Sequence, residues 1–307
     1  MIKKSFIILL FVLIAFNIYG DNSASGLFLN IPYNAELMGI ANSSVGAAKG
    51  LVSIDNNVAG ISSVENGEAF ISYNKWLFDT SSLFFSAGYS LRNIGVVGFS
   101  VRTLSLPVLE NKYYTTVQYE NSDIAIGFSY AKNLKKVLNI PFSVGISAKY
   151  ISEKLANISA TTFLIDVGFL YYITDSIGIG IAVKNIGSGI DFDDYGNNSP
   201  VYIDSGVSYK YIFKKAAIEH LLTTLNFKYS LYADLSPGFG EEIYFSSFNN
   251  ITPVLRLGLQ YRDGMSFSEM MTFGAGLKWI NIIFDYSFSN IVSEVGYTHI
   301  LSIKYRF

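Results

Sequence analysis

The stretch at residues 176–185, Ser-Ile-Gly-Ile-Gly-Ile-Ala-Val-Lys-Asn, decides the fold. Ile177, Ile179, Ile181 and Val183 alternate with residues that are small or polar. Because successive side chains of a β-strand point to opposite faces, one face of this strand is apolar and the other is small and polar. The same alternation returns along most of the chain, in runs close to the about 9–11 residues that a strand needs to cross a bilayer. The pattern predicts a transmembrane β-barrel.

The alternating runs predict about fourteen antiparallel strands within residues 67–307, an all-β membrane-spanning barrel. The weakest run is 241–248, where the alternation is poor, but without it the number of strands would be odd. Single-chain bacterial barrels have an even number of strands, and closure leaves no unpaired edge in lipid. We expect the longer loops at residues 105–121, 187–200 and 233–240. The strands are expected at residues 69–74, 83–91, 97–102, 124–130, 142–150, 163–171, 177–183, 203–211, 225–231, 241–248, 255–261, 273–279, 282–288 and 301–307.

The composition agrees with a membrane barrel. Hydrophobic residues make up 50% of the 307 residues and charged residues only 15%, below the soluble average of about 25%. The chain has 26 glycines and no cysteine, which excludes disulfides and thiolate metal sites. The formal net charge of −2 argues against a nucleic-acid partner, since such proteins carry a strongly basic face.

The first 20 residues read as a secretory signal peptide. Met1-Ile-Lys-Lys is basic, residues 5–16 are apolar, and residues 18–20 provide a cleavage site. An uncleaved anchor helix is the alternative. We expect the mature chain to be exported to the outer membrane of a Gram-negative-type bacterium.

Residues 21–66 do not alternate, and we expect them to form an N-terminal plug, or hatch, inside the barrel. They carry glycines, two short helical possibilities at residues 35–40 and 57–62, and apolar clusters at 27–29 and 37–38. These clusters are too apolar for a free tail, although a disordered leader is the alternative. The plug candidates are Leu37, Gly39, Asn57 and Gly60.

The charges inside the predicted strands fall almost wholly on the inward parity. A charge facing lipid at the membrane midplane costs roughly 2–4 kcal/mol, so this sorting is expected. The cations could attract the carboxylate of an amphipathic ligand, or they could pair with Asp166, Asp204 and Asp285 in a network that packs the plug. The candidates for ligand contact in the lumen are Arg102, Lys149, Lys184, Lys210, Arg256 and Lys278, in a row that also holds Lys228, Lys304 and Arg306.

The same parity places Leu257 towards lipid and Gly258 towards the lumen. We therefore expect Leu257→Arg to impair assembly and Gly258→Ser to be mild. Tyrosine and tryptophan gather near the strand ends, as in the aromatic girdles of membrane barrels. The girdle candidates are Tyr73, Trp76, Tyr130, Tyr150, Tyr171, Tyr211, Tyr229, Trp279 and Tyr305.

The chain offers little for an enzyme, a metal or a cofactor. It has two histidines, His220 and His299, and we interpret both as interfacial rather than catalytic residues. Asp191, Asp193 and Asp194 form a small acidic cluster. It lacks the glycine and the bidentate glutamate of a calcium loop, so a solvated loop is the better interpretation.

Residues 69–81, running on into 95–101, are similar to the first hairpins of FadL-like outer-membrane proteins, nearest the PorV/PorQ-type branch and an uncharacterised spirochaete family. Residues 57–61, Asn-Val-Ala-Gly-Ile, resemble the Asn-Pro-Ala-Gly-Leu of that branch without its proline. Gly39-Ile-Ala-Asn-Ser keeps one glycine of its Gly-Met-Gly-Gly-Ala. Residues 299–307, ending in Phe307, look like the final strand read by the outer-membrane assembly machinery.

The resemblance implies a fourteen-stranded barrel with an N-terminal plug and two classes of function. A FadL-like protein is a passive channel for hydrophobic or amphipathic small molecules such as long-chain fatty acids. A PorV-like protein is an outer-membrane scaffold that binds a secreted or surface protein. A porin-like structural or adhesive protein is a third possibility. The moderate length of the expected loops favours the channel, with lipid, the assembly machinery and a hydrophobic small molecule as partners.

Overall fold

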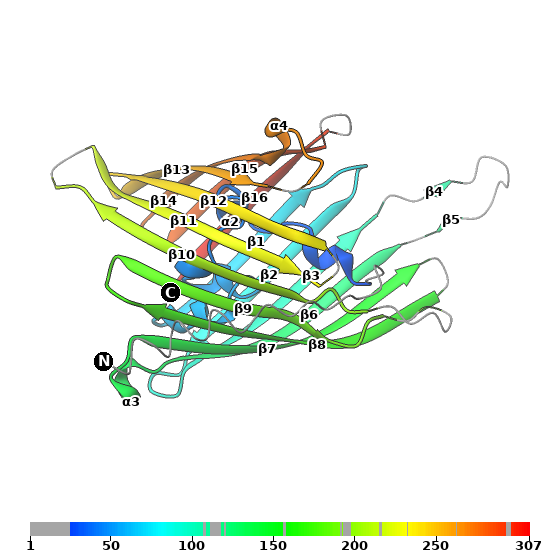
Figure 1. Cartoon of the computed structure of the whole chain (residues 1–307), viewed down its shortest axis with the longest axis horizontal. Helices are drawn as coiled ribbons and strands as arrows, with labels where there is room; N and C mark the ends of the chain where they lie inside the picture. The colour runs from blue at the N-terminus through cyan, green and yellow to red at the C-terminus, as the bar shows by residue number, and fades with distance from the viewer. Residues whose placement is uncertain are drawn as a thin grey trace.

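Fourteen antiparallel strands close into a barrel in the computed structural model (Figure 1). The structure describes residues 25–106, 109–110, 118–119, 121–155, 158–190, 192, 198–214, 217–231, 233–261, 263–292 and 296–307. The predicted architecture and strand number are confirmed. The strands of the barrel are β1 (Gly67–Lys75), β2 (Ser81–Ser90), β3 (Val96–Ser105), β6 (Ser122–Asn133), β7 (Phe142–Leu155), β8 (Ile158–Tyr172), β9 (Ile177–Gly187), β10 (Tyr202–Ile212), β11 (Ile218–Ser230), β12 (Ala233–Phe245), β13 (Ile251–Gln260), β14 (Met271–Trp279), β15 (Ile282–Val292) and β16 (Gly296–Arg306).

The barrel closes where β1 pairs with β16. Gly67 N donates to Phe307 O at 3.2 Å, and Phe307 N donates back to Gly67 O at 3.0 Å. The ring of Phe307 occupies the place where a Cβ on residue 67 would stand, so a side chain there would displace the ring. From this seam the register runs from Glu68–Arg306 to Lys75–His299. Apart from this seam and the β3–β6 pair, each strand of the barrel pairs with the strands that precede and follow it in the sequence.

The connections differ in length between the two ends of the barrel. The long ones, such as 106–121, 188–201 and 261–270, share one end, where the small hairpin of β4 (Leu109–Glu110) and β5 (Gln118–Tyr119) projects beyond the wall (Figure 1). Helix α4 (Phe267–Met270) also belongs to this end, and α3 (Lys135–Leu138) to the other. Bacterial outer-membrane barrels have short periplasmic turns and long external loops, so we call the two ends outer and periplasmic.

One predicted loop is wrong. Residues 233–240 belong to β12, which then runs on through most of the weakly alternating stretch at 241–248. Pro237 hides the strand in the sequence, because proline has no N–H to donate to a ladder. The Pro237 carbonyl accepts from Tyr261 N at 2.9 Å, just beyond the end of β13. The proline nitrogen, which has no hydrogen to donate, therefore points to where the pairing with β13 has ended.

The outer face of the wall is apolar and the inner face is polar or small. Phe128 is 65% exposed, Phe163 71% and Leu257 46%, whereas Ser86, Ser147 and Ser287 are buried. This confirms the alternation, and such an outward apolar belt suits a bilayer. No helix among the described residues has the length and apolar character that a bilayer crossing requires.

Residues 25–66, which we call the lumenal segment, run inside the barrel as short helical turns (blue in Figure 1). They form η1 (Leu27–Asn30), α2 (Ala35–Met38), η2 (Val45–Ala47), η3 (Leu51–Ser53) and η4 (Val58–Ser63). The predicted signal peptide at residues 1–20 lies outside the described residues, and its cleavage stays a prediction.

Candidate functional site

The lumenal segment packs against glycines on the inner face of the wall. Gly178 and Gly180, from the alternating stretch of β9, lie against the backbone of Val45 and Gly46, where an added Cβ would meet main-chain atoms. On β7, a Cβ added to Gly145 would come within 2.6 Å of Val58 C and 2.7 Å of Ala59 N. The glycines on the inner face of these strands therefore allow the backbone of the segment to pack directly against the wall.

This packing corrects one expectation. Gly258 does face inward, but a Cβ there would meet the backbone at Ile40 and Ala41 as well as the Thr272 hydroxyl. Gly258→Ser therefore disturbs the segment, and it is not the mild change that alternation alone predicts. The plug candidate Gly39 is part of the same contact, since a Cβ on it would stand 3.0 Å from Gly274 Cα and 3.1 Å from Arg256 Cβ.

Asn57, another plug candidate, ties two turns of the segment to the wall. Its Nδ2 donates to Val45 O at 3.1 Å and to Phe169 O on β8 at 3.0 Å. Its Oδ1 accepts from Ala59 N at 3.2 Å and so caps η4. Gly60, three residues on, lies too close to Ala48 and Ser53 to carry a side chain.

Arg102 holds the first turns of the segment. Its guanidinium donates to Leu29 O at 3.1 Å and to Ile31 O. The same group lies over the rings of Phe28 and Tyr33, with centroids 5.8 and 5.4 Å away. Arg102 is only 2% exposed, so this candidate for ligand contact is buried and already binds the segment.

Three other candidate cations are paired within the wall. Lys149 Nζ lies 2.7 Å from Asp166 Oδ2, and Lys184 Nζ lies 2.9 Å from Asp204 Oδ2. Arg256 binds two carboxylates, with Nε 2.8 Å from Glu242 and Nη1 2.7 Å from Asp285. Buried charges require such partners, because an isolated ion in a poorly solvated interior is strongly destabilised.

Glu36, on α2, links the segment to the last strand. Its Oε2 accepts from Lys304 Nζ at 3.1 Å. Burial by itself raises the pKa of Glu36, but Lys304, Arg256 and Lys278 outweigh it and lower the pKa to about 2. The carboxylate is therefore ionised throughout the physiological range, and the ion pair remains intact.

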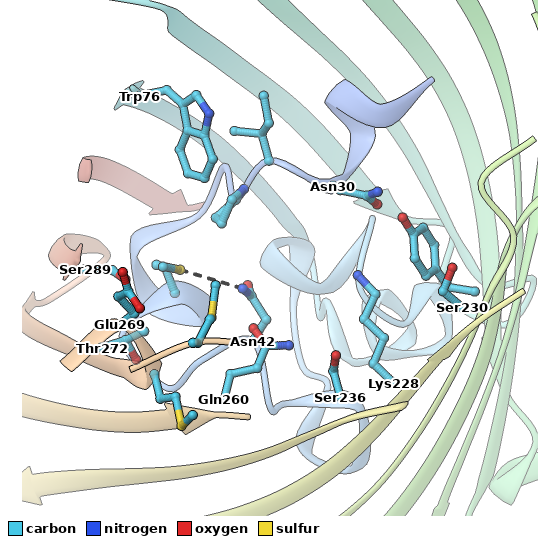
Figure 2. A pocket seen from close by; sticks show the side chains of 16 residues that line it. Asn30, Asn42, Trp76, Lys228, Ser230, Ser236, Gln260, Glu269, Thr272 and Ser289 are labelled. Carbon is cyan, nitrogen blue, oxygen red and sulfur yellow. Dashed lines mark hydrogen bonds between the residues drawn. The ribbon is translucent and has the colours of Figure 1, made fainter. Parts of the chain in front are cut away.

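A cavity of about 310 Å³ opens on the outer side of the segment (Figure 2). Trp76, an expected girdle residue, instead lines this cavity at its upper edge in the view, across from Gln260. Three of the chain's five methionines, Met38, Met265 and Met270, also line it. Methionine is flexible and polarisable, and it adapts to apolar and aromatic ligands. Among the other lining residues are Asn30, Ile31, Pro32, Asn42, Tyr202, Lys228, Ser230, Ser236, Glu269, Thr272 and Ser289.

A smaller cavity of about 80 Å³ adjoins the first and shares Asn42, Tyr202 and Lys228 with it. Arg102, Lys149 and Lys184 reach its walls, so three of the predicted ligand residues meet here, and the remaining three do not. Asp55 of the segment faces them, and burial raises its pKa.

A third cavity, of about 540 Å³, lies on the periplasmic side of the segment. Lys210 and Lys278 line it, together with Lys304 and Arg306. Leu37, a plug candidate that is 5% exposed, borders both this cavity and the small one. The segment thus stands between the outer and the periplasmic cavities.

The described residues hold no group of three or more acidic or histidine side chains placed to bind a metal ion. His220 stacks on Tyr244 in the periplasmic cavity, with ring centroids 4.1 Å apart. His299 Nδ1 and the Tyr286 hydroxyl are 2.8 Å apart on the exposed side of the wall. Asp191, Asp193 and Asp194 lie outside the described residues.

Sequence patterns missed some of these residues. Glu242 lies in the poorly alternating stretch, and its role as the partner of Arg256 follows only from the β12–β13 register, in which the two residues are opposite each other. Trp76 follows the last residue of β1 at the outer end, which is also where a girdle aromatic would stand. Only the path of the following turn decides which way it points.

No family model matches the chain, and no curated protein matches its sequence. Solved structures do share its fold. The CymD monoaromatic hydrocarbon channel is 12% identical with a TM-score of 0.60, covering 92% of this chain and 99% of CymD. The P. putida toluene transporter TodX is 9% identical with a TM-score of 0.55, covering 84% and 94%. A Pseudomonas aeruginosa FadL homologue is 10% identical with a TM-score of 0.52, covering 90% and 99%. The FadL-like resemblance is confirmed for the fold, and the PorV/PorQ-type branch stays a prediction.

Proposed function

We propose that this protein is an outer-membrane channel for the passive uptake of hydrophobic or amphipathic small molecules, with the lumenal segment as its gate. The outer cavity carries this proposal. Trp76, Met38 and Met265 give it an apolar and aromatic lining, and Asn42 and Gln260 add polar groups that can orient a ligand. Pockets for small molecules combine these two features.

The path through the barrel supports a gated channel. The outer cavity ends at the segment, and the larger periplasmic cavity begins on its other side. A molecule that enters from outside therefore passes only when the segment moves. Channels for monoaromatic hydrocarbons share this fold, which agrees with an apolar cargo that the protein carries without changing it chemically.

The experiment uses tryptophan fluorescence, because the chain has only Trp76 and Trp279. Trp279 is 49% exposed on the outer face of the wall, so Trp279→Phe leaves Trp76 as the reporter of the cavity. Toluene and dodecanoate, each titrated into the folded barrel in detergent, should change the Trp76 emission with a saturable dependence on concentration.

The matched control is Trp76→Phe, which leaves Trp279 in the detergent belt as the reporter. It should show only the gradual, non-saturating change of a ligand that partitions into detergent. A Trp76 signal that is equally non-saturating for both probes would contradict binding in this cavity.

A scaffold for a secreted or surface protein is the second candidate. One observation favours it: the segment is fixed to the wall by both backbone packing and ion pairs, as expected for a permanently filled barrel. A stoichiometric protein partner in a pull-down from detergent extract, together with an unresponsive Trp76, would establish the scaffold in place of the channel.

A further inference from the structure

The periplasmic cavity is lined by twice as many cations as carboxylates. The carboxylates are Glu36, Asp175 and Glu242. In the two cavities on the outer side, positive and negative charges are nearly equal in number. Four cations line them, together with three carboxylates, those of Asp55, Asp204 and Glu269. The excess of positive charge is therefore specific to the periplasmic side. The cations there are Lys49, Lys135, Lys210, Lys278, Lys304 and Arg306.

Four of these six cations have no carboxylate partner among the described residues, and two of the four, Lys210 and Lys278, are half-buried in the wall. Lys304 is paired with Glu36 and Arg306 with Glu68, but within the part of the chain that the structure describes, Lys210 and Lys278 have no carboxylate oxygen within 4.0 Å. Glu242 and Asp285, the nearby acids in the wall, are taken by Arg256. The two ammonium groups are thus available to a ligand.

Lys278 is held in a defined position without being neutralised. Its Nζ lies 4.1 Å from the centroid of the Tyr244 ring, an attractive arrangement between a cation and an aromatic face. The Tyr244 hydroxyl donates to Glu242 at 2.9 Å, which fixes the ring. His220 on β11 stacks on the same ring, whereas Lys278 on β14 approaches from the other side of β12. The site is built rather than a loose group of surface lysines.

A concave site with excess ammonium groups and low-dielectric walls concentrates anions. Charge-assisted hydrogen bonds from lysine to phosphate or carboxylate oxygens are among the stronger polar contacts. We propose that the periplasmic cavity binds a phosphate or carboxylate group, with Lys210 and Lys278 among the cations that attract it, as a free anion or as the headgroup of an amphipathic molecule. This site does not depend on transport through the barrel.

The experiment measures binding of inorganic phosphate and of dihexanoylphosphatidic acid by calorimetry, with the folded full-length barrel in a neutral detergent at low salt. The double variant Lys210→Gln/Lys278→Gln should lose at least tenfold in affinity. The matched control, Lys214→Gln, removes an exposed lysine of the β10–β11 turn at the same end that does not line the cavity, and it should stay within twofold of the unmodified protein.

A second measurement needs no variant. Acetic anhydride labelling of the unmodified protein, mapped by mass spectrometry, should be slowed by phosphate at Lys210 and Lys278 and not at Lys214. Equal binding by the two probes indicates a free-anion site, and binding of the phosphatidic acid alone indicates a headgroup site. Absence of binding by both probes, unchanged affinity in the double variant, or protection of all three lysines alike would overturn the proposal.

Discussion

The two sides of the lumenal segment are held by different forces. On one side, η2 and η4 lie on the glycines of β7–β10, and the contact is between backbones. On the other side, α2 faces β14–β16, where Gly39 at its end lies close to Gly274 and Glu36 adds an ion pair with Lys304. We call these the glycine side and the ion-pair side.

The difference indicates which part of the segment is able to move. Contacts between backbones cannot be broken by rotating a side chain, so η2 and η4 either stay packed on the wall or detach from it together. An ion pair can exchange its partner for another ion or for water, with a net free energy of only a few kcal/mol. We therefore expect α2 to be the mobile element and η4 to be the anchor.

Removing residues 25–53 should have the largest effect, because it takes away α2 and η2 together and leaves only the anchor at η4. The barrel wall does not depend on these residues for its strand pairing, so it should still fold. Planar-bilayer recordings should show larger and steadier ion conductance than the intact protein. A folded barrel that conducts no better than the intact one would place the gate elsewhere and favour the scaffold.

Gly180→Val should have the next largest effect, and it acts on the glycine side alone. The new side chain would occupy the position of Val45 O, and overpacking against a fixed backbone costs about 3 kcal/mol. Limited proteolysis should cut the segment of this variant much faster. The control, Ala148→Val, adds two methyl groups on the exposed face of β7 and should leave proteolysis unchanged. Equal protection in both variants would show that the glycine contacts do not hold the segment.

Glu36→Gln should have the smallest effect, because it weakens only the ion-pair side. The loss of a charge-assisted hydrogen bond costs about 1.5 kcal/mol, or roughly a tenfold increase in the population of released α2. Single-channel recordings should show more frequent openings without a larger maximal conductance. An increase in maximal conductance would mean that the whole segment leaves, which would erase the distinction between the two sides.

The pKa of Glu36 adds a test by pH. Its pKa of about 2 in the folded protein lies below the ordinary value of 4.5, so the ion pair stabilises the docked state above about pH 4.5. This contribution is lost only as the pH falls through about 2. On the proposed channel function, opening of the unmodified protein through release of this ion pair should therefore be the same at pH 7 and pH 5.

The outer face of the barrel could be predicted from the sequence because lipid imposes a simple rule on every outward residue. Leu257 and Phe163 follow that rule without reference to any other part of the chain. Pro237 breaks the local pattern of β12, and only the pairing with β13 shows why it is tolerated there.

The interior could be predicted only in part, because its contacts join residues far apart in sequence. Alternation places Arg256 inward, but the choice of Glu242 and Asp285 as its partners depends on the register of three successive strand pairings. Likewise, Gly180 looks like a small residue facing water until the segment is seen against it. Alternation identifies which face a residue occupies and does not identify what that face touches.

The seam between β1 and β16 sets an order of events during folding. Gly67 and Phe307 join strands more than 200 residues apart, and their pairing completes a ring around the segment. Once the ring is complete, the turns that rest on β9 have no side entrance through which to arrive. We therefore expect the growing sheet to pack around the segment before the last strand pairs, so that the N-terminal residues are enclosed as the barrel closes.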